Sequence, residues 1–212
     1  MTDELHALHE DAHLLVLEKP AGLLCVPGRG EDKQDCLSAR ALRRWPDALV
    51  VHRLDMATSG LVLMARSPAV QRALGDAFAT QEVWKRYEAI VDGVIDGESW
   101  SVIDAPLAAD WPRRPMQKVD PAGKPSLTRW RALRALPESN ATHLLLEPRT
   151  GRTHQLRVHL ASIGHPILGD ALYANEEVAT RARRLMLHAS VLQLRHPVTG
   201  DALRVESAVP FA

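Results

Sequence analysis

The sequence predicts an α+β fold, with a mixed and mostly antiparallel central sheet flanked by helices and loops. Segments with strand character outnumber segments with helix character, and the two kinds do not alternate regularly along the chain. A doubly wound α/β fold would need that alternation, because a crossover helix follows each parallel strand. The length of 212 residues and the hydrophobic content of 46% are enough for a domain with a substantial core.

In the first part of the chain, apolar runs and turn residues mark the elements. The run HLLVLE (13–18) predicts a strand that ends at the turn KPAG (19–22). Residues 36–45 fit a helix that ends at the proline after it. The run LVLMA (61–65) fits a buried strand. Residues 67–78 begin with Ser-Pro, an N-cap and first-turn proline, and carry apolar side chains at helical spacing.

The second part of the chain is richer in strands. Residues 85–91 (KRYEAIV) alternate as a strand does, which places Tyr87 on one face with Ala89 and Val91. A helix is expected to start after an N-cap at Thr153 and to end before Gly164. Further strands are expected near 127–133, 143–147, 185–194 and 202–207.

The net charge of zero conceals an uneven distribution. Residues 110–157 hold ten basic and four acidic side chains, whereas 1–50 and 51–109 each hold three more acidic than basic ones. The basic residues cluster around Pro and Gly turns, where loops present side chains to a ligand. Guanidinium groups suit phosphates. The charge alone leaves open RNA, DNA, a phosphorylated small substrate, or a solvated face.

Several classes of protein do not fit. The chain lacks the basic start and apolar run of a secretory signal, and no apolar stretch approaches the ~20 residues of a membrane span. We therefore expect a soluble, cytoplasmic protein with no membrane partner. Cys25 and Cys36 are too far apart for a CxxC motif and are expected to stay reduced. Walker, GxGxxG and GxSxG motifs are absent, and the spacing of the histidines argues against a metal site.

Three segments carry candidate chemistry. In VHRLDMATSG (51–60), Arg53 and Asp55 flank a leucine on a loop, although Asp55 could instead cap the local turn. In RTGRTHQLRVH (149–159), a glycine turn leads into a helix, and Arg157 could pair with a carboxylate such as Asp55 and keep it ionised. Tyr87 could be a core residue or a ring on which a base stacks.

Together these segments resemble the RluA family of pseudouridine synthases. HRLDMATSG (52–60) is similar to the family's catalytic loop, and KRYEAIV (85–91) is similar to its tyrosine strand. TGRTHQLRVHLASIGHPILGD (150–170) resembles the arginine-bearing segment, and RLMLHA (184–189) resembles the C-terminal strand. The short, dual-specificity members, which act on large-subunit ribosomal RNA and the tRNA anticodon stem-loop, look most similar in VPGR (26–29), DWPRRPMQKV (110–119) and GKPSLT (123–128).

The resemblance implies a fold, a site and a partner. The fold would be a single pseudouridine synthase domain over 1–212, with two lobes sharing one sheet, a catalytic cleft across it and no S4 domain. Asp55 would be the catalytic aspartate, Tyr87 the active-site tyrosine and Arg157 the arginine that pairs with the aspartate. Arg53 would fill the RNA stack after the target base has flipped out. The partner would be RNA, the protein a monomer, and the family uses neither metal nor organic cofactor. Further RNA contacts are expected from Arg113, Arg114, Lys118 and Arg152.

The implied reaction breaks the C1′–N1 bond of uridine, turns the uracil and joins C5 to C1′. A buried carboxylate could attack the sugar or remove a sugar proton, and the sequence does not choose between these routes. Three alternatives stay open: a tRNA-only synthase of the same family, a non-catalytic RNA-binding module, and a glycoside hydrolase. The last would need a second carboxylate about 5–9 Å from Asp55.

Overall fold

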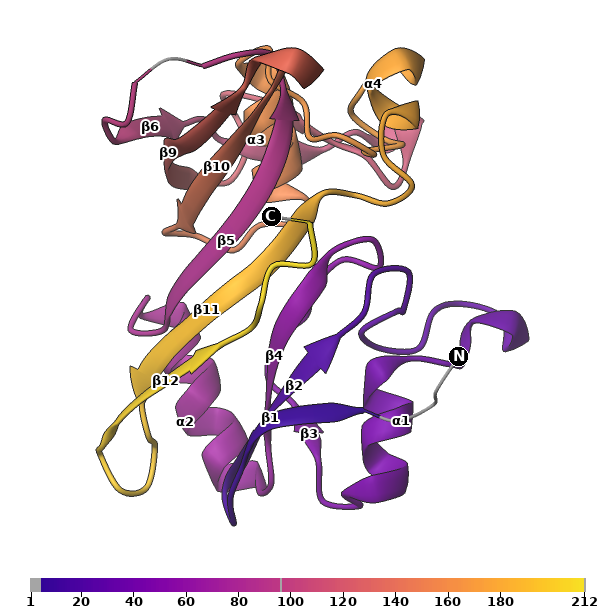
Figure 1. The fold of residues 1–212 in the computed structure, drawn as a ribbon. Coiled ribbons are helices and arrows are strands. Elements are labelled where there is room, and N and C mark those ends of the chain that lie inside the picture. The colour runs from indigo at the N-terminus through magenta and orange to yellow at the C-terminus, as the bar shows by residue number, and fades with distance from the viewer. Residues whose placement is uncertain (1–4, 96, 212) are drawn as a thin grey trace. The chain divides into compact units, whose positions relative to one another are not determined.

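The computed structural model describes residues 5–95 and 97–211. Twelve strands accompany four α-helices in this described part, which confirms the α+β class. The chain divides into two compact units, each with its own strands (Figure 1). Unit 1 comprises Met1–Lys85 with Ala189–Ala208, and unit 2 comprises Arg86–His188 with Val209–Ala212.

Unit 1 is built on a sheet whose central strands are mostly apolar and buried. Its strands are β1 (His6–Glu10), β2 (Leu14–Lys19), β3 (Leu49–Val50), β4 (Ser59–Ala65), β12 (Ala202–Glu206) and, from Ala189 on, β11 (Leu187–Arg195). They are hydrogen-bonded in the order β1-β2-β4-β11, with β3 added to β4 and β12 to β11. Every residue of β4 is buried. Burial on both faces explains why its sequence does not alternate between apolar and polar residues.

Two helices complete unit 1, and both begin at a side-chain cap. In α1 (Leu37–Arg44), the Cys36 thiol accepts the Ala39 N–H at 3.4 Å. In α2 (Pro68–Ala79), the Ser67 hydroxyl accepts the Val70 N–H at 3.3 Å, as the Ser-Pro pair predicts. One apolar core joins α2 to strands β2, β4, β11 and β12. Cys25 and Cys36 are buried free thiols.

Unit 2 combines a sheet with a short separate hairpin. Its elements are β5 (Trp84–Asp92, from Arg86 on), β6 (Ser101–Asp104), β7 (Leu107–Ala109), β8 (Gln117–Val119), β9 (Leu127–Leu136), β10 (Ala141–Pro148), α3 (Gln155–Ser162) and α4 (Glu176–Thr180). The sheet runs β5-β10-β9-β6, with antiparallel pairing at each step, and β7 pairs with β8. Short 3-10 turns lie at Glu31–Lys33, Trp111–Arg113 and Pro137–Ser139.

The start of α3 differs from the sequence prediction, and Thr153 is not its N-cap. His154 takes that position with a left-handed φ of 54° and makes no side-chain cap. The buried amide of Gln155 organises the preceding loop instead, because its Oε1 accepts the Arg152 N–H at 3.0 Å and the Thr150 hydroxyl at 2.7 Å. A side chain of the helix itself thus satisfies polar groups of the loop before it.

Throughout residues 5–95 and 97–211, no helix is both long enough and apolar enough to cross a membrane.

Candidate active site

The loop that carries Asp55 lies between β3 and β4 of unit 1. The Thr58 N–H donates to the Asp55 carbonyl at 3.1 Å, which closes a turn around the aspartate. Leu54 is buried and anchors the loop, whereas Arg53 is exposed and Asp55 is half-buried. The turn therefore presents an arginine and an aspartate on either side of an apolar anchor, as the sequence predicts for Arg53 and Asp55.

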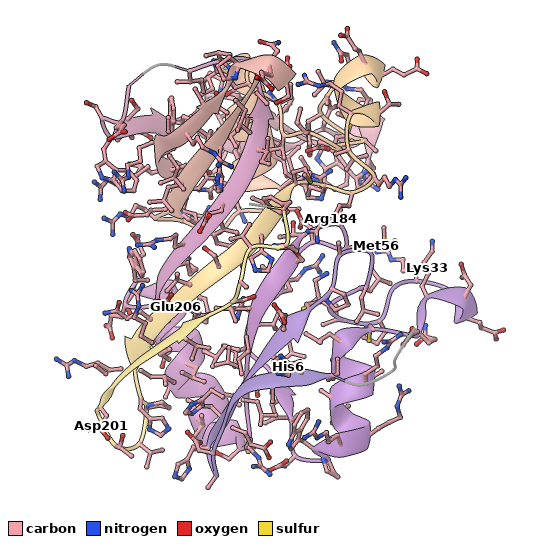
Figure 2. The ribbon with its side chains drawn as sticks, viewed as in Figure 1. His6, Lys33, Met56, Arg184, Asp201 and Glu206 are labelled. Carbon is pink, nitrogen blue, oxygen red and sulfur yellow. The ribbon has the colours of Figure 1, made fainter. Side chains whose placement is uncertain are left out.

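Lys19, the last residue of β2, holds this loop in place through hydrogen bonds. Its side chain is 0% exposed, and its Nζ donates to the carbonyls of Pro20, Leu23 and Met56 at 2.8, 2.7 and 3.0 Å. The Met56 carbonyl also accepts the Gly22 N–H at 2.8 Å. Met56, labelled in Figure 2, directly follows Asp55 in the chain. A buried ammonium group is costly without partners, so these carbonyls and the loop are held in one arrangement.

His52 fixes the start of the same loop against β4. Its Nε2 accepts the Leu63 N–H at 2.9 Å, and its ring packs on Phe78 with 4.6 Å between centroids. Burial lowers the pKa of His52 from 6.5 to about 3, and the nearby Lys85 ammonium adds to this shift. His52 is therefore neutral at physiological pH, as its role of hydrogen-bond acceptor requires.

Gly60, the second residue of β4, lies where two strands of unit 1 approach closely. Its φ is 112°, and a Cβ there would lie 2.3 Å from the Ala189 carbonyl oxygen. No side chain fits in that space, and few residues adopt that φ. The glycine of HRLDMATSG thus lets β11 lie against β4 directly after the loop.

Tyr87 lies on β5 and pairs with Leu146 of β10. Its side chain is half-buried, while Ala89 and Val91, which share its face of the strand, are fully buried. Tyr87 therefore stands where the apolar face of β5 becomes accessible. That position suits a ring which contacts both the core and a ligand.

Arg157 is buried in α3 and held by Asp170 through two hydrogen bonds. Its Nε and Nη2 donate to the two carboxylate oxygens at 2.8 and 2.6 Å, and the side chains are 5% and 0% exposed. Asp170 also accepts the backbone N–H groups of Leu172 and Tyr173. The sequence singled out Asp55 as the partner of Arg157. Asp55 belongs to unit 1 and Arg157 to unit 2, so that pairing stays a prediction.

Polar contacts also attach the rest of α3 to the sheet of unit 2. The Gln155 amide donates to Thr128 Oγ1 at 3.0 Å, and Thr128 is bonded to His159 Nδ1 at 2.9 Å. His159 Nε2 donates to the Ala105 carbonyl at 3.0 Å. Burial lowers the pKa of His159, so its ring is neutral and its Nδ1 accepts the Thr128 hydroxyl. This network positions the helix that carries Arg157.

The four basic residues expected to contact RNA fall into two groups. Arg113 and Lys118 form ion pairs with Asp110 and Asp120, at 2.5 and 2.9 Å. Arg114 lies over the Trp111 ring, with 3.6 Å from its Cζ to the ring centroid. The Nε of Arg152 donates to the Pro125 carbonyl at 3.2 Å. All four side chains are exposed. The charges of Arg113 and Lys118 are partly neutralised by their carboxylate partners.

Sequence reasoning missed the residues that hold the site in place. The sequence pattern places Lys19 only in a turn and indicates no role for Asp170 or Tyr173. The one signal for Lys19 is that it shares a face of the strand with Leu15 and Leu17, which predicts that its side chain is buried. Asp170 carries no such signal, because its partner Arg157 lies 13 residues earlier in the chain.

The α+β fold is that of a pseudouridine synthase. The family model described as RNA pseudouridylate synthase matches residues 13–162. The chain belongs to this family. It is an isomerase that forms pseudouridine in RNA.

Curated relatives are similar over most of their length. The dual-specificity RNA pseudouridine synthase RluA of Escherichia coli (strain K12) is 45% identical over 188 residues, which is 88% of this chain and 85% of the relative. The protein of the same name from Vibrio cholerae is 45% identical over 89% of this chain and 76% of the relative.

Solved structures agree with the fold. Human RNA Pseudouridylate Synthase Domain Containing 1 has a TM-score of 0.83 at 29% identity, covering 99% of this chain and 85% of that chain. Human RNA Pseudouridylate Synthase Domain Containing 4 has a TM-score of 0.79 at 24% identity, covering 97% and 88%. The second likeness concerns the fold alone.

Proposed function

We propose that this chain isomerises specific uridines in two kinds of RNA, stem-loops of large-subunit ribosomal RNA and the anticodon arm of tRNA. The observation that carries the proposal is its identity of 45% with relatives described as dual-specificity RNA pseudouridine synthases, over 88% of this chain. The basic segment 110–157, with ten basic and four acidic side chains, supplies a suitable surface for a folded RNA.

Asp55 is the proposed catalytic group. The C1′–N1 bond of the target uridine breaks, C5 forms a bond to C1′, the proton of C5 is lost and N1 gains a proton, so the base is isomerised without a change in composition. The carboxylate either attacks C1′ or removes a proton from the sugar, and both routes need it ionised. Arg157 is its proposed partner, because a nearby guanidinium favours the ionised form.

Tyr87 and Arg53 are proposed to handle the base. The uracil must stay bound while it turns, and the ring of the half-buried Tyr87 offers a face on which it can stack. A target in a folded loop leaves its stack at a cost of a few kcal/mol. The exposed Arg53 would occupy the gap and offset part of this cost.

The two units are proposed to act as one catalytic domain, with two lobes sharing a sheet, because Asp55 belongs to unit 1 and Tyr87 and Arg157 belong to unit 2. We further propose that the chain works as a monomer in the cytoplasm, where ribosomal RNA and tRNA are both accessible to it.

Site-resolved mapping of pseudouridine in two synthetic RNAs tests the proposal. Wild type should convert one uridine in a large-subunit ribosomal stem-loop and one in a tRNA anticodon stem-loop, and Asp55→Asn should convert neither. Conversion of the tRNA stem-loop alone would identify a tRNA-only synthase. Binding of both RNAs without any conversion would identify an RNA-binding module and contradict the proposal.

A further inference from the structure

Unit 2 contains a pocket of about 580 Å³ that the proposed catalytic residues do not line. Its volume lies within the range of about 300–1,000 Å³ that is typical of small-ligand sites. The β7–β8 hairpin forms one wall, and the loop before α3 forms another. The lining residues that matter for its chemistry are Trp111, Gln117, Lys124, Gly151, Arg152 and Thr153.

Hydrogen bonds hold both walls of the pocket in place. The Tyr173 hydroxyl accepts the Gln117 N–H at 2.8 Å and is bonded to His154 Nδ1 at 2.6 Å, which ties β8 to the residue before α3. The buried Gln155 holds the other wall, because its Oε1 accepts the Arg152 N–H at 3.0 Å. The pocket is thus built before a ligand arrives, which lowers the entropic cost of binding.

Positive charge at the pocket is not neutralised from within the protein. Across residues 5–95 and 97–211, no carboxylate pairs with Lys124 or Arg152, and both side chains are exposed. This contrasts with Arg113 and Lys118 in the same segment, which have Asp110 and Asp120 as partners. An anionic ligand would therefore find two available cations in the pocket.

An aromatic ring completes the lining. Trp111 is 66% exposed although it is a large hydrophobic residue, and the Arg114 guanidinium lies over its ring. An exposed tryptophan beside available cations suits a ligand with a flat ring and a negative charge. A nucleotide has both features.

We propose that this pocket binds a nucleotide of the RNA substrate other than the target uridine, with its base against Trp111 and its phosphate at Lys124 and Arg152. The inference rests on the proposed RNA substrate and deepens it, because it identifies where a second nucleotide of the same loop is recognised. The pocket would set the register of the loop, so that one particular uridine reaches the catalytic aspartate.

The test measures dissociation constants for a stem-loop RNA, together with kcat and KM. Lys124→Gln and Arg152→Gln should each weaken binding about threefold to tenfold and reduce the slope of log K against log salt by about 0.7–0.9. Trp111→Ala should weaken binding about tenfold or more. KM should rise in parallel with the dissociation constant. Arg183→Gln, which alters an exposed arginine of unit 2 outside the lining, should bind like wild type.

Abasic substitution at each loop position in turn identifies the bound nucleotide. At one position other than the target, removal of the base should weaken binding by wild type but not by Trp111→Ala. Thermal unfolding of each variant checks that the fold is intact. The inference would be overturned if the effects of Trp111→Ala and of base removal on the binding free energy were additive at every loop position. It would also be overturned if all three pocket variants bound RNA with wild-type affinity.

The two proposals fail in distinguishable ways. If wild type forms pseudouridine and the pocket variants bind normally, the pocket assignment is wrong and the activity stands. The opposite result is that wild type forms no pseudouridine, while removal of one base still weakens RNA binding by wild type but not by Trp111→Ala. The proposed activity would then be wrong and the nucleotide pocket would stand.

Discussion

Arg157 and Asp170 form a buried ion pair whose two hydrogen bonds fix the plane of the guanidinium. The side chains are 5% and 0% exposed, so neither charge has water to replace its partner. Such a pair contributes less to stability than its distances suggest, since both ions lose their hydration. Its value lies in orientation, because a guanidinium held by two hydrogen bonds does not move freely between rotamers.

Removal of one charge from this buried pair should lower the free energy of unfolding far more than removal of one charge from an exposed pair of the same geometry. We expect Asp170→Asn to lower the free energy of unfolding by about 3–5 kcal/mol, because a buried guanidinium loses its counter-charge. The matched control is Asp35→Asn, since Asp35 holds Arg40 through the same two-bond contact on the surface. Urea denaturation of the three proteins measures the effect, and equal losses in both variants would show that burial does not matter here.

His52 gives the protein a defined sensitivity to acid. Its pKa is about 3 in the folded chain against 6.5 in the unfolded one, so the unfolded state takes up its proton first as the pH falls. Its contribution to stability is complete above pH 6.5 and is lost between pH 6.5 and 3, by about 1.4 kcal/mol per pH unit. At pH 5 the loss is about 2 kcal/mol.

The measurement compares urea unfolding of wild type and His52→Gln at neutral pH and near pH 5. Glutamine keeps a hydrogen-bond acceptor but does not titrate, so the variant should lose less stability on acidification than wild type does. His159 and other groups titrate equally in both proteins, and their effect cancels in the difference. Identical losses would mean that His52 is protonated in the folded protein.

At the scale of whole elements, the loop between β3 and β4 is held in shape by residues of the neighbouring strands. Lys19 on β2 ties three carbonyls together, and Gly60 allows β11 to lie against β4 where the loop ends. The apolar runs predict both central strands, because burial on both faces requires continuous apolar sequence. The hydrogen bond from Lys19 to Met56 joins residues 37 positions apart, and local patterns carry no information about such contacts.

Replacement of Lys19 should therefore disturb catalysis through the loop. We expect Lys19→Met to lower the free energy of unfolding by roughly 2–4 kcal/mol, because buried carbonyls lose their donor. It should also lower kcat more than it raises KM, since Asp55 is displaced while the RNA-binding surface is unchanged. The exposed Lys33 supplies the control, and Lys33→Met should retain both stability and kcat. A variant of Lys19 with normal kcat would contradict the proposed role.

The sequence pattern does not predict the shortest helices and strands, and the reason is physical. The strands β6, β7 and β8 have three or four residues each, and α4 has five, too few for a periodic pattern to stand out. The N-cap of α3 was misplaced because a Thr before a helix usually caps it, whereas Gln155 satisfies that loop here. Long elements such as α2 were predicted well, since their caps and apolar spacing agree.

Over the whole molecule, the distribution of charge is more informative than its sum. The neutral total combines an acidic first half with the basic segment 110–157. The structure divides that basic segment further, into cations paired with carboxylates and cations at a pocket that have none. Sequence reasoning found the segment but not this division, because Asp110 and Asp120 each lie within four residues of two basic side chains and spacing alone does not show which cations they pair with.

We propose that Asp55 drives the isomerisation of uridine in RNA, and release of tritium tests this role most directly. C5 of uridine must lose its hydrogen when it bonds to C1′, so stem-loop RNA labelled with tritium at C5 releases one tritium to water for each pseudouridine formed. Wild type should release tritium in that proportion, and Asp55→Asn should bind the same RNA but release none. Tritium release by Asp55→Asn at the wild-type rate, or no release by wild type, would contradict the account.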